Sequence, residues 1–223
     1  PFFPLLVVSC NAFVVRIPSH GVHQGKSMLK STTVDMKDTT PASTADVSSP
    51  KSYVEKGDLD TEALLAKSTF AIKPDDLITL AKDFTFINGA GTKDNGACLA
   101  DDFVFRAAYI EVIDKEKFVA TLGGFSLEDS FDMKQQFFGW TVDPLQPNRV
   151  WVINRQEAVH TNDFVGVKPT GKTLVLPPQR LHFDFQADGK CTEFGFYTVD
   201  RNQGNTGGPG GALAFFSGVC RPI

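Results

Sequence analysis

Apolar and polar positions predict helices in the first part of the folded chain. After Asp60-Thr61-Glu62, apolar side chains recur at intervals of three and four residues, the spacing of one helical face. Pro74-Asp75-Asp76 opens a second helix, because proline is accepted in a first turn and acidic side chains favour the positive end of the helix dipole. A third helix is predicted over Asp114–Leu122, which Gly123-Gly124 would end.

The later part of the chain has the pattern of β-strands, with β-branched and aromatic residues between turn signals. A short strand at Phe103–Arg106 should follow a helix or turn around Gly96–Ala100, and Ala212–Val219 is predicted to be a closing strand. Asp188-Gly189 predicts a hairpin turn. The other predicted strands are Gln135–Val142, Arg149–Val159, Thr173–Leu176, Leu181–Gln186 and Cys191–Val199. Helices followed by long antiparallel strands predict an α+β fold, with N-terminal helices packed on one face of a curved sheet.

The N-terminal residues have the composition of a targeting segment. Residues 1–8 are an apolar run and residues 9–12 are mostly small, as at the end of a signal peptide before its cleavage site. Residues 13–34 are basic, rich in Ser and Thr and free of acidic residues, which is the composition of a transit peptide. The Ala12-Phe13 junction resembles that of the bipartite plastid leaders of diatoms and related algae. We therefore expect a plastid location, a signal-peptide remnant at 1–12, a transit peptide and disordered linker at 13–57, and a folded domain at 58–223. An ordinary secretory leader with a disordered tail is the alternative.

Composition narrows the classes of partner. Hydrophobic residues make up 42% and charged residues 22%, as in soluble globular proteins. The net charge of −4 and the lack of a Lys/Arg run argue against nucleic-acid binding. Residues 1–8 are too short an apolar run to span a bilayer, so no membrane span is expected in the mature protein. Twenty Phe against three Tyr and two Trp predict a core or cavity with aromatic walls.

The four cysteines give no metal signature. They lie at positions 10, 98, 191 and 220, without a C-x-x-C pair or a histidine at zinc-finger spacing, so no metal site is expected. A disulfide between Cys191 and Cys220 is left open by the sequence.

Gly166–Thr173 matches the phosphate-binding pattern G-x-x-x-x-G-K-[ST] letter for letter. That motif binds a nucleotide only where a helix begins directly after it. Pro177 and Pro178 follow too soon for such a helix. The segment is therefore predicted to bind no nucleotide, and Lys168-Pro169-Thr170-Gly171 is interpreted as a turn between two strands.

Several motifs together resemble the SnoaL-like branch of the NTF2-like superfamily. They are Leu99-Ala-Asp-Asp-Phe-Val-Phe, the stretch from Arg155 to His160-Thr161, Phe164–Thr173 with its PTGK turn, and the strand from Phe183 that ends in Asp188-Gly189-Lys190. The resemblance covers roughly residues 75–200. It implies a cone of curved sheet closed by helices, with an apolar pocket and no cofactor. The branch contains cyclases, isomerases and hydratases as well as non-catalytic binding and dimerisation modules, so the fold does not select among them.

His182 and Asp200 are the candidate catalytic residues. Leu181–Phe185 alternates, which places His182 and Asp184 on the face opposite the phenylalanines. The resemblance implies a polar cavity residue near His182, where an imidazole would serve as an acid or base. The carboxylate expected in the following strand is replaced by Phe196, so Asp200 would serve only with a shifted register. The alternatives are a hydrogen-bonded surface or interface histidine, and an aspartate that pairs with Arg201 or caps the next turn.

The candidate ligand-binding residues are Arg155, His160, Trp151, Tyr197 and Phe196. Arg155 would bind a ligand carboxylate bidentately, or else pair with Glu157 or Asp163 on the sheet surface. Gly204–Gly211 is interpreted as a wide turn, with a lid or ligand clamp as the alternative.

Two functions follow from the sequence. The first is a domain that encloses a small hydrophobic molecule and isomerises or cyclises it by acid/base chemistry. The second is a non-catalytic binding module or homodimerisation module. A third reading is a metal-independent carbonic anhydrase of the same superfamily, but its paired His and paired Ser are absent around Phe215-Phe216-Ser217-Gly218.

Overall fold

The computed structural model describes residues 53–54, 56–108, 110–122, 127–208 and 210–220. The chain divides into two compact units, Pro1–Asp60 and Thr61–Ile223, and every element described below lies in the second. The predicted leader and most of the predicted linker lie outside the described residues, so those boundaries stay predictions. Among the helices of the described ranges, none is long and apolar enough to cross a membrane.

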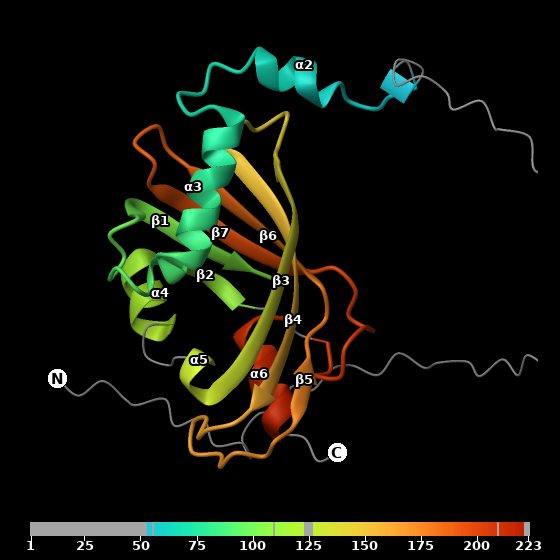
Figure 1. Cartoon of the computed structure of the whole chain (residues 1–223). Coiled ribbons are helices and arrows are strands. Elements are labelled where there is room, and N and C mark those ends of the chain that lie inside the picture. The colour runs from blue at the N-terminus through green and yellow to red at the C-terminus, as the bar shows by residue number, and fades with distance from the viewer. Residues whose placement is uncertain (1–52, 55, 109, 123–126, 209, 221–223) are drawn as a thin grey trace, which may run out of the picture. The chain divides into compact units, whose positions relative to one another are not determined.

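Helices and strands alternate in the first half of this unit, and strands dominate the second (Figure 1). The helices are α2 (Thr61–Ala66), α3 (Pro74–Phe86), the 3-10 turn η1 (Gly89–Gly91), α4 (Lys115–Leu122), α5 (Leu127–Ser130) and α6 (Ala212–Cys220). The strands are β1 (Leu99–Ala107), β2 (Ile110–Asp114), β3 (Phe131–Val142), β4 (Arg149–His160), β5 (Thr173–Val175), β6 (Gln179–Phe185) and β7 (Cys191–Thr198).

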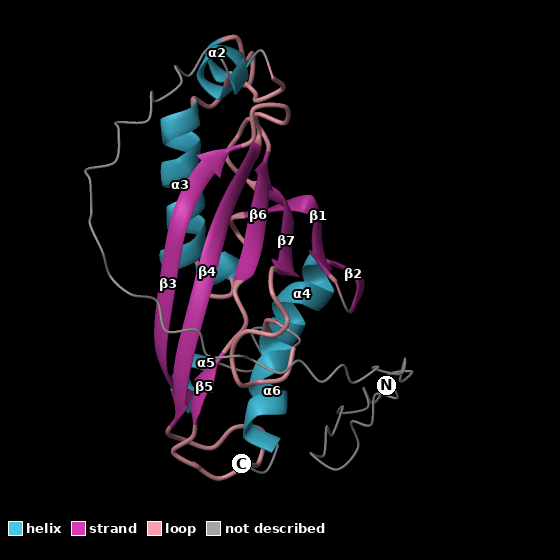
Figure 2. Ribbon diagram, turned by 90° about the vertical axis from the view of Figure 1, so that its right-hand side faces the viewer, coloured by secondary structure: helices cyan, strands magenta, loops and turns pink. Residues whose placement is uncertain are grey.

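The strands form one sheet in the order β2-β1-β7-β6-β4-β3, with β5 paired to β4 beyond the end of β6. All neighbours are antiparallel except β1 and β7, which run parallel. Figure 2 shows β3 and β4 as long neighbouring strands that extend past the others. The predicted α+β class, with helices on one face of a curved antiparallel sheet, is confirmed.

Phenylalanine side chains join the helices to one face of the sheet. The ring of Phe84 in α3 lies 5.2 Å from that of Phe183 in β6 and 6.2 Å from that of Phe194 in β7. Phe118 in α4 packs on Phe105 in β1 at 5.0 Å. We call this side the helix-covered face and the opposite side the outer face. The alternation predicted for β6 is confirmed, since Phe183 points to the helices and its neighbours His182 and Asp184 do not.

A second apolar cluster covers the far half of the helix-covered face. Phe215 of α6 packs on Phe131 of β3 at 4.9 Å, and Leu174 of β5 completes the contact. The sequence predicted a closing strand here, and that prediction is wrong. Asn205 already occupies the free edge of β5, since its backbone N–H donates to the Val175 carbonyl at 2.8 Å. With that edge taken, the apolar run satisfies its backbone polar groups as a helix.

Other boundaries differ from prediction. β2 and α5 were not predicted, β1 begins at Leu99, and β3 begins at Phe131 instead of Gln135. The tight turn between β4 and β5 lies at Val165-Gly166, both with positive φ, instead of at Lys168–Gly171. Thr173, the last residue of the P-loop pattern, begins strand β5 and not a helix.

The two sequence features at the β6–β7 junction have different outcomes. The hairpin predicted at Asp188-Gly189 is confirmed, with Gly189 at φ 86° and the Gln186 N–H bonded to the Lys190 carbonyl. Cys191 carries a free, buried thiol, so the disulfide with Cys220 that the sequence left open does not form.

Candidate functional site

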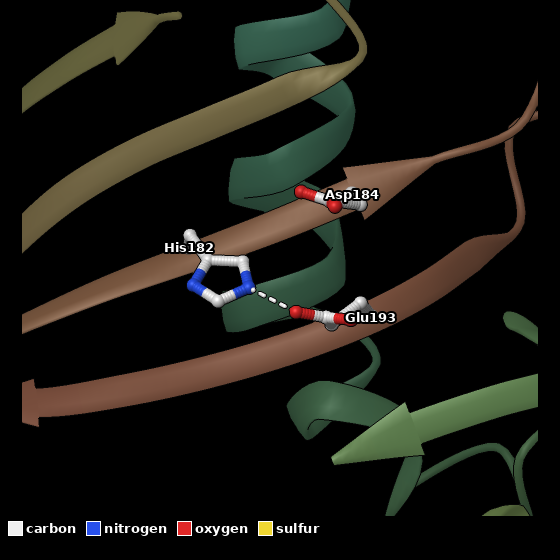
Figure 3. Close-up of side chains that lie close together, drawn as sticks. All are labelled: His182, Asp184 and Glu193. Carbon is white, nitrogen blue, oxygen red and sulfur yellow. Dashed lines mark hydrogen bonds and ion pairs between the residues drawn. The ribbon is translucent and has the colours of Figure 1, made fainter. Parts of the chain in front are cut away.

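His182 lies on the outer face in a closed network of charged side chains (Figure 3). Its Nε2 is 3.0 Å from Oε1 of Glu193, which is one strand away in β7. Glu193 accepts a hydrogen bond from the Arg106 guanidinium at 2.8 Å. Asp184 accepts two hydrogen bonds from Arg149, each at 2.6 Å. Arg149 also lies 3.7 Å from Glu193, which joins these contacts into one network. The adjacent strands β1, β7, β6 and β4 therefore supply it with two acids, two arginines and one imidazole.

The imidazole of His182 is fully buried although it lies opposite the helices. Tyr197 stacks on one side at 5.7 Å and Trp151 meets it edge-on at 5.2 Å. Gly195 lies directly across from it in β7, where a Cβ atom would collide with the ring. Burial, followed by the charge of Arg149, lowers the pKa of His182 below its usual value, against the opposing effect of Asp184 and Glu193. The folded protein therefore holds this side chain neutral near pH 7.

Ligand atoms of His182, Asp184 and Glu193 lie within 4.8 Å of one another, close enough to converge on a metal ion. The two carboxylates already bind guanidinium groups, Asp184 that of Arg149 and Glu193 that of Arg106. A divalent cation would have to displace those groups or lie beside two positive charges. The arrangement fits an ion-pair network better than a metal centre.

The helix-covered face holds an open cavity of about 570 Å³. It lies where the end of α3 and the following turn approach α5 and the first half of β3. Its lining residues are Thr85, Phe86, Lys93, Glu128, Phe131, Asp132, Met133, Gln135 and Thr161. Phe86, Phe131 and Met133 supply an apolar wall, and Lys93 pairs with Glu128 at 3.4 Å. The cavity is therefore apolar on one wall and polar along the rest.

The structure does not bring the two candidate catalytic residues together. Asp200 follows β7 and caps the next turn, since its Oδ1 accepts the Asn202 N–H at 2.9 Å and its Oδ2 accepts the Gln203 side chain at 3.1 Å. The structure therefore shows the alternative role of Asp200, in which it caps the turn after β7. His182 lies within β6, enclosed by its own neighbours, so the pair shares no cavity.

Arg155 lies on the outer face, where its guanidinium stacks 5.9 Å from the ring centre of Phe138. Neither expected ion pair is formed, because Glu157 pairs with Lys134 at 3.6 Å and Asp163 with Lys168 at 3.0 Å. Arg155 also lines a hollow of about 160 Å³ with Gln136, Gln203 and the start of the glycine-rich loop. The predicted role of Arg155 in binding a ligand carboxylate stays a prediction.

The remaining candidates divide between the two faces. His160 is fully buried on the helix-covered face, where its ring lies 5.0 Å from that of Phe131 and its Nδ1 is 3.0 Å from Thr170 Oγ1. Phe196 packs on Phe105 on the same face. Trp151 and Tyr197 belong to the outer face, around His182. The five predicted ligand-binding residues therefore do not line one pocket.

Sequence reasoning missed the partners of His182 and the wall of the cavity. Glu193 and Arg149 come from neighbouring strands, and only strand order and register place them beside His182. The cavity wall at Phe131 and Met133 was missed because β3 was predicted to begin four residues later. The alternating Phe131-Asp-Met-Lys-Gln pattern was the available signal.

The fold and its two faces define the class of the domain as α+β, with one curved sheet and helices on one side. No protein-family model matches the sequence, and no curated protein matches it. Several solved structures resemble the chain.

A SnoaL-like polyketide cyclase, so named, from Jannaschia sp. CCS1 is 18% identical over 70% of this chain and 98% of its own, with a TM-score of 0.48. A protein named as a polyketide cyclase from Xanthomonas campestris pv. campestris is 22% identical over 54% and 88%, with a TM-score of 0.43. An LEH-like epoxide hydrolase from M. tuberculosis is 12% identical over 56% and 84%, with a TM-score of 0.42. Similarity at this level does not extend to activity or to individual residues.

Proposed function

We propose that the domain binds a small organic molecule, largely apolar and uncharged, in the cavity on its helix-covered face. The observation that carries this proposal is the cavity itself. Its volume of about 570 Å³ falls within the range of ordinary small-molecule sites, roughly 300–1,000 Å³. Phe86, Phe131 and Met133 would contact the apolar body of the molecule, and the polar residues of the rim would remain hydrated.

The chemistry of the sheet supports an uncharged ligand. Strand register places the side chains of Phe131, Met133 and Gln135 on the same face as Ala158 and Gln156. The charged residues of the cavity lining are Lys93 and Glu128, which pair with each other at 3.4 Å, and the exposed Asp132 of β3. An ionised group held against the apolar wall of Phe86, Phe131 and Met133 would lose its hydration.

We propose binding without chemistry at His182. The imidazole lies on the other side of the sheet from the cavity, and Trp151, Tyr197 and Glu193 enclose it. A molecule in the cavity would be separated from it by the sheet. An isomerase or cyclase mechanism that uses His182 would need a substrate on the outer face and the displacement of these neighbours.

The test is a binding titration with 2-isopropenylnaphthalene, an uncharged aromatic probe. Met133→Trp should fill the cavity and weaken binding at least tenfold, since the added indole occupies the volume that the probe needs. Gln136→Trp is the matched control, because the same side chain on the opposite face of β3 should leave the affinity unchanged. Equal affinity of the two variants, or no binding by the unmodified protein, would refute the proposal.

The second candidate function is association of two copies through the outer face. Phe138, Tyr197 and Val112 are exposed there at 47%, 39% and 50% of their surface. The ion pairs Arg106–Glu193 and Arg149–Asp184 put both signs of charge on the same face, which a second copy could match. This observation favours a homodimer that forms independently of ligand binding in the cavity.

A further inference from the structure

Three adjacent strands change from apolar to polar side chains at the same level of the helix-covered face. In register, Asn154 of β4 pairs with Gln179 of β6, and Gln179 pairs with Thr198 of β7. The residues on one side of this row belong to the first apolar cluster: Val150, Val152, Leu181, Phe183, Phe194 and Phe196. On the other side begin Leu174, Leu176 and Ala158 of the second cluster. We call Asn154, Gln179 and Thr198 the polar row.

The polar row contains buried polar atoms that have no hydrogen-bond partner. Asn154 and Gln179 are each only 5% exposed. Oδ1 of Asn154, Nε2 of Gln179 and Oγ1 of Thr198 are all inaccessible and unpaired. An unpaired polar atom in an apolar interior destabilises a fold, by about 1–3 kcal/mol for each group. Three such atoms at neighbouring positions of one face offer hydrogen-bonding partners to a ligand oxygen.

The polar row is shaped by the glycine-rich segment above it. Gly210 approaches so closely that a Cβ atom there would lie 2.8 Å from Thr198 Oγ1 and 3.0 Å from Gln179 Nε2. Gly211 lies over the ring of Phe196 in the same way. The backbone of Gly210 therefore lies against the Gln179 and Thr198 end of the row, and the Asn154 end faces β3.

The Asn154 end lies next to the wall of the cavity. Gln135, which lines the cavity, pairs with Gln156, and Asn154 is the diagonal neighbour of Gln135 on the same face. Diagonal neighbours in an antiparallel pair have Cα atoms about 7–8 Å apart. Asn154 does not itself line the cavity, so a molecule of a few rings would reach its amide from the Gln135 side.

From this geometry we infer that the polar row holds the hydroxyl or carbonyl oxygen of the uncharged molecule that occupies the cavity. The inference rests on the proposed function and adds the chemical class of the ligand, a neutral oxygenated compound with an apolar body. The row offers an amide N–H donor, an amide oxygen acceptor and a hydroxyl that serves as either. A ketone or an alcohol satisfies these atoms without bringing a charge into the face.

The experiment compares two probes of nearly equal shape, 2-acetylnaphthalene and the hydrocarbon 2-isopropenylnaphthalene, by equilibrium dialysis against the full chain. We expect the ketone to bind about tenfold more tightly, since a neutral hydrogen bond in a dry site contributes about that factor. Asn154→Leu and Gln179→Leu should each remove the preference and leave the affinity for the hydrocarbon unchanged. Gln136→Leu, the same kind of change on the outer face, should keep the preference.

The outcomes separate this inference from the proposed function. If the unmodified protein binds both probes equally, or if both leucine variants keep the preference, the polar row binds no ligand oxygen and the inference is overturned, while the cavity proposal stands. If neither probe binds, the cavity proposal fails as well. Thermal unfolding of the leucine variants gives a second measurement. Their midpoints should equal or exceed that of the unmodified protein, because each change removes an unpaired buried group, and a large decrease would show that the amides already have partners inside the fold.

Discussion

Burial sets the protonation of two histidines in the folded protein. Burial is the first cause that lowers the pKa of His160, and also that of His182, where the charge of Arg149 adds to the effect. Glu193 balances two influences: burial acts to raise its pKa, but the hydrogen bonds from Arg106 and His182 outweigh it and hold the pKa below its usual value. The outer-face network is thus built for a neutral imidazole between ionised partners.

The stability of the protein should decrease as the pH falls below about 6.5, the pKa of an unfolded histidine. Below that pH the unfolded chain binds protons that the folded imidazoles do not, so the free energy of unfolding declines. Urea unfolding followed by tryptophan fluorescence at pH 7.5, 6.5 and 5.5 measures this. His160→Gln should make the decline shallower. A free energy of unfolding that is constant or rises over this range would contradict the assignment of both histidines as neutral.

At the residue scale, the sequence predicted the side of the strand on which His182 lies but not its surroundings. Alternation in Leu181–Phe185 separates histidine from phenylalanine, and the structure agrees. The bond to Glu193 depends on the register between β6 and β7, which the hairpin turn at Asp188-Gly189 sets. The resemblance implied a cavity residue near His182, and nothing in the pattern of this strand alone distinguishes an inner face from an outer one.

At the scale of elements, α6 shows where pattern reasoning fails. Ala212–Val219 is a continuous apolar run, and such a run of eight or nine residues is compatible with a buried strand or a buried helix. Contacts with the rest of the fold favour the helix, because the edge of β5 is already occupied and Phe131 offers an apolar surface to pack against. By contrast, α3 was predicted correctly because its first turn and its 3.6-residue period are local properties.

The packing of α6 leads to a prediction about stability. Phe215→Ala should lower the free energy of unfolding by about 3–5 kcal/mol, because it leaves a cavity beside Phe131 in the second apolar cluster. Leu213→Ala, two positions earlier and only half-buried, should lower it by clearly less. Chemical denaturation of both variants measures the difference. Similar values for the two would mean that α6 does not pack through Phe215.

At the scale of the whole molecule, the fold class followed from the order of helices and strands, whereas the parallel β1–β7 pair did not. That pair joins residues about ninety positions apart, and no local signal specifies it. The cavity and the polar row likewise depend on side chains from three or more elements. Composition alone had indicated many aromatic contacts, and the described phenylalanines do pack against one another, but ten of them fill the core between α3, α4 and the sheet.

The outer face should make the full chain a dimer at micromolar concentration. Light scattering coupled to size-exclusion chromatography should give twice the monomer mass for the unmodified protein and a monomer for Phe138→Glu, since the new charge would be buried at the interface. Leu145→Glu is the control, because Leu145 is 71% exposed but lies in the turn between β3 and β4. A monomeric unmodified protein would remove the dimer as a candidate function.

Gly195 lies opposite His182, at a point where even one methyl group would meet the imidazole. Its φ is not in the left-handed region, so the backbone would accept another residue and only the facing ring forbids it. Position 195 is therefore free to vary only when position 182 carries a smaller side chain. During evolution, a larger side chain at 195 requires a smaller one at 182 first, and this order of events would leave the two positions correlated among descendants of this chain.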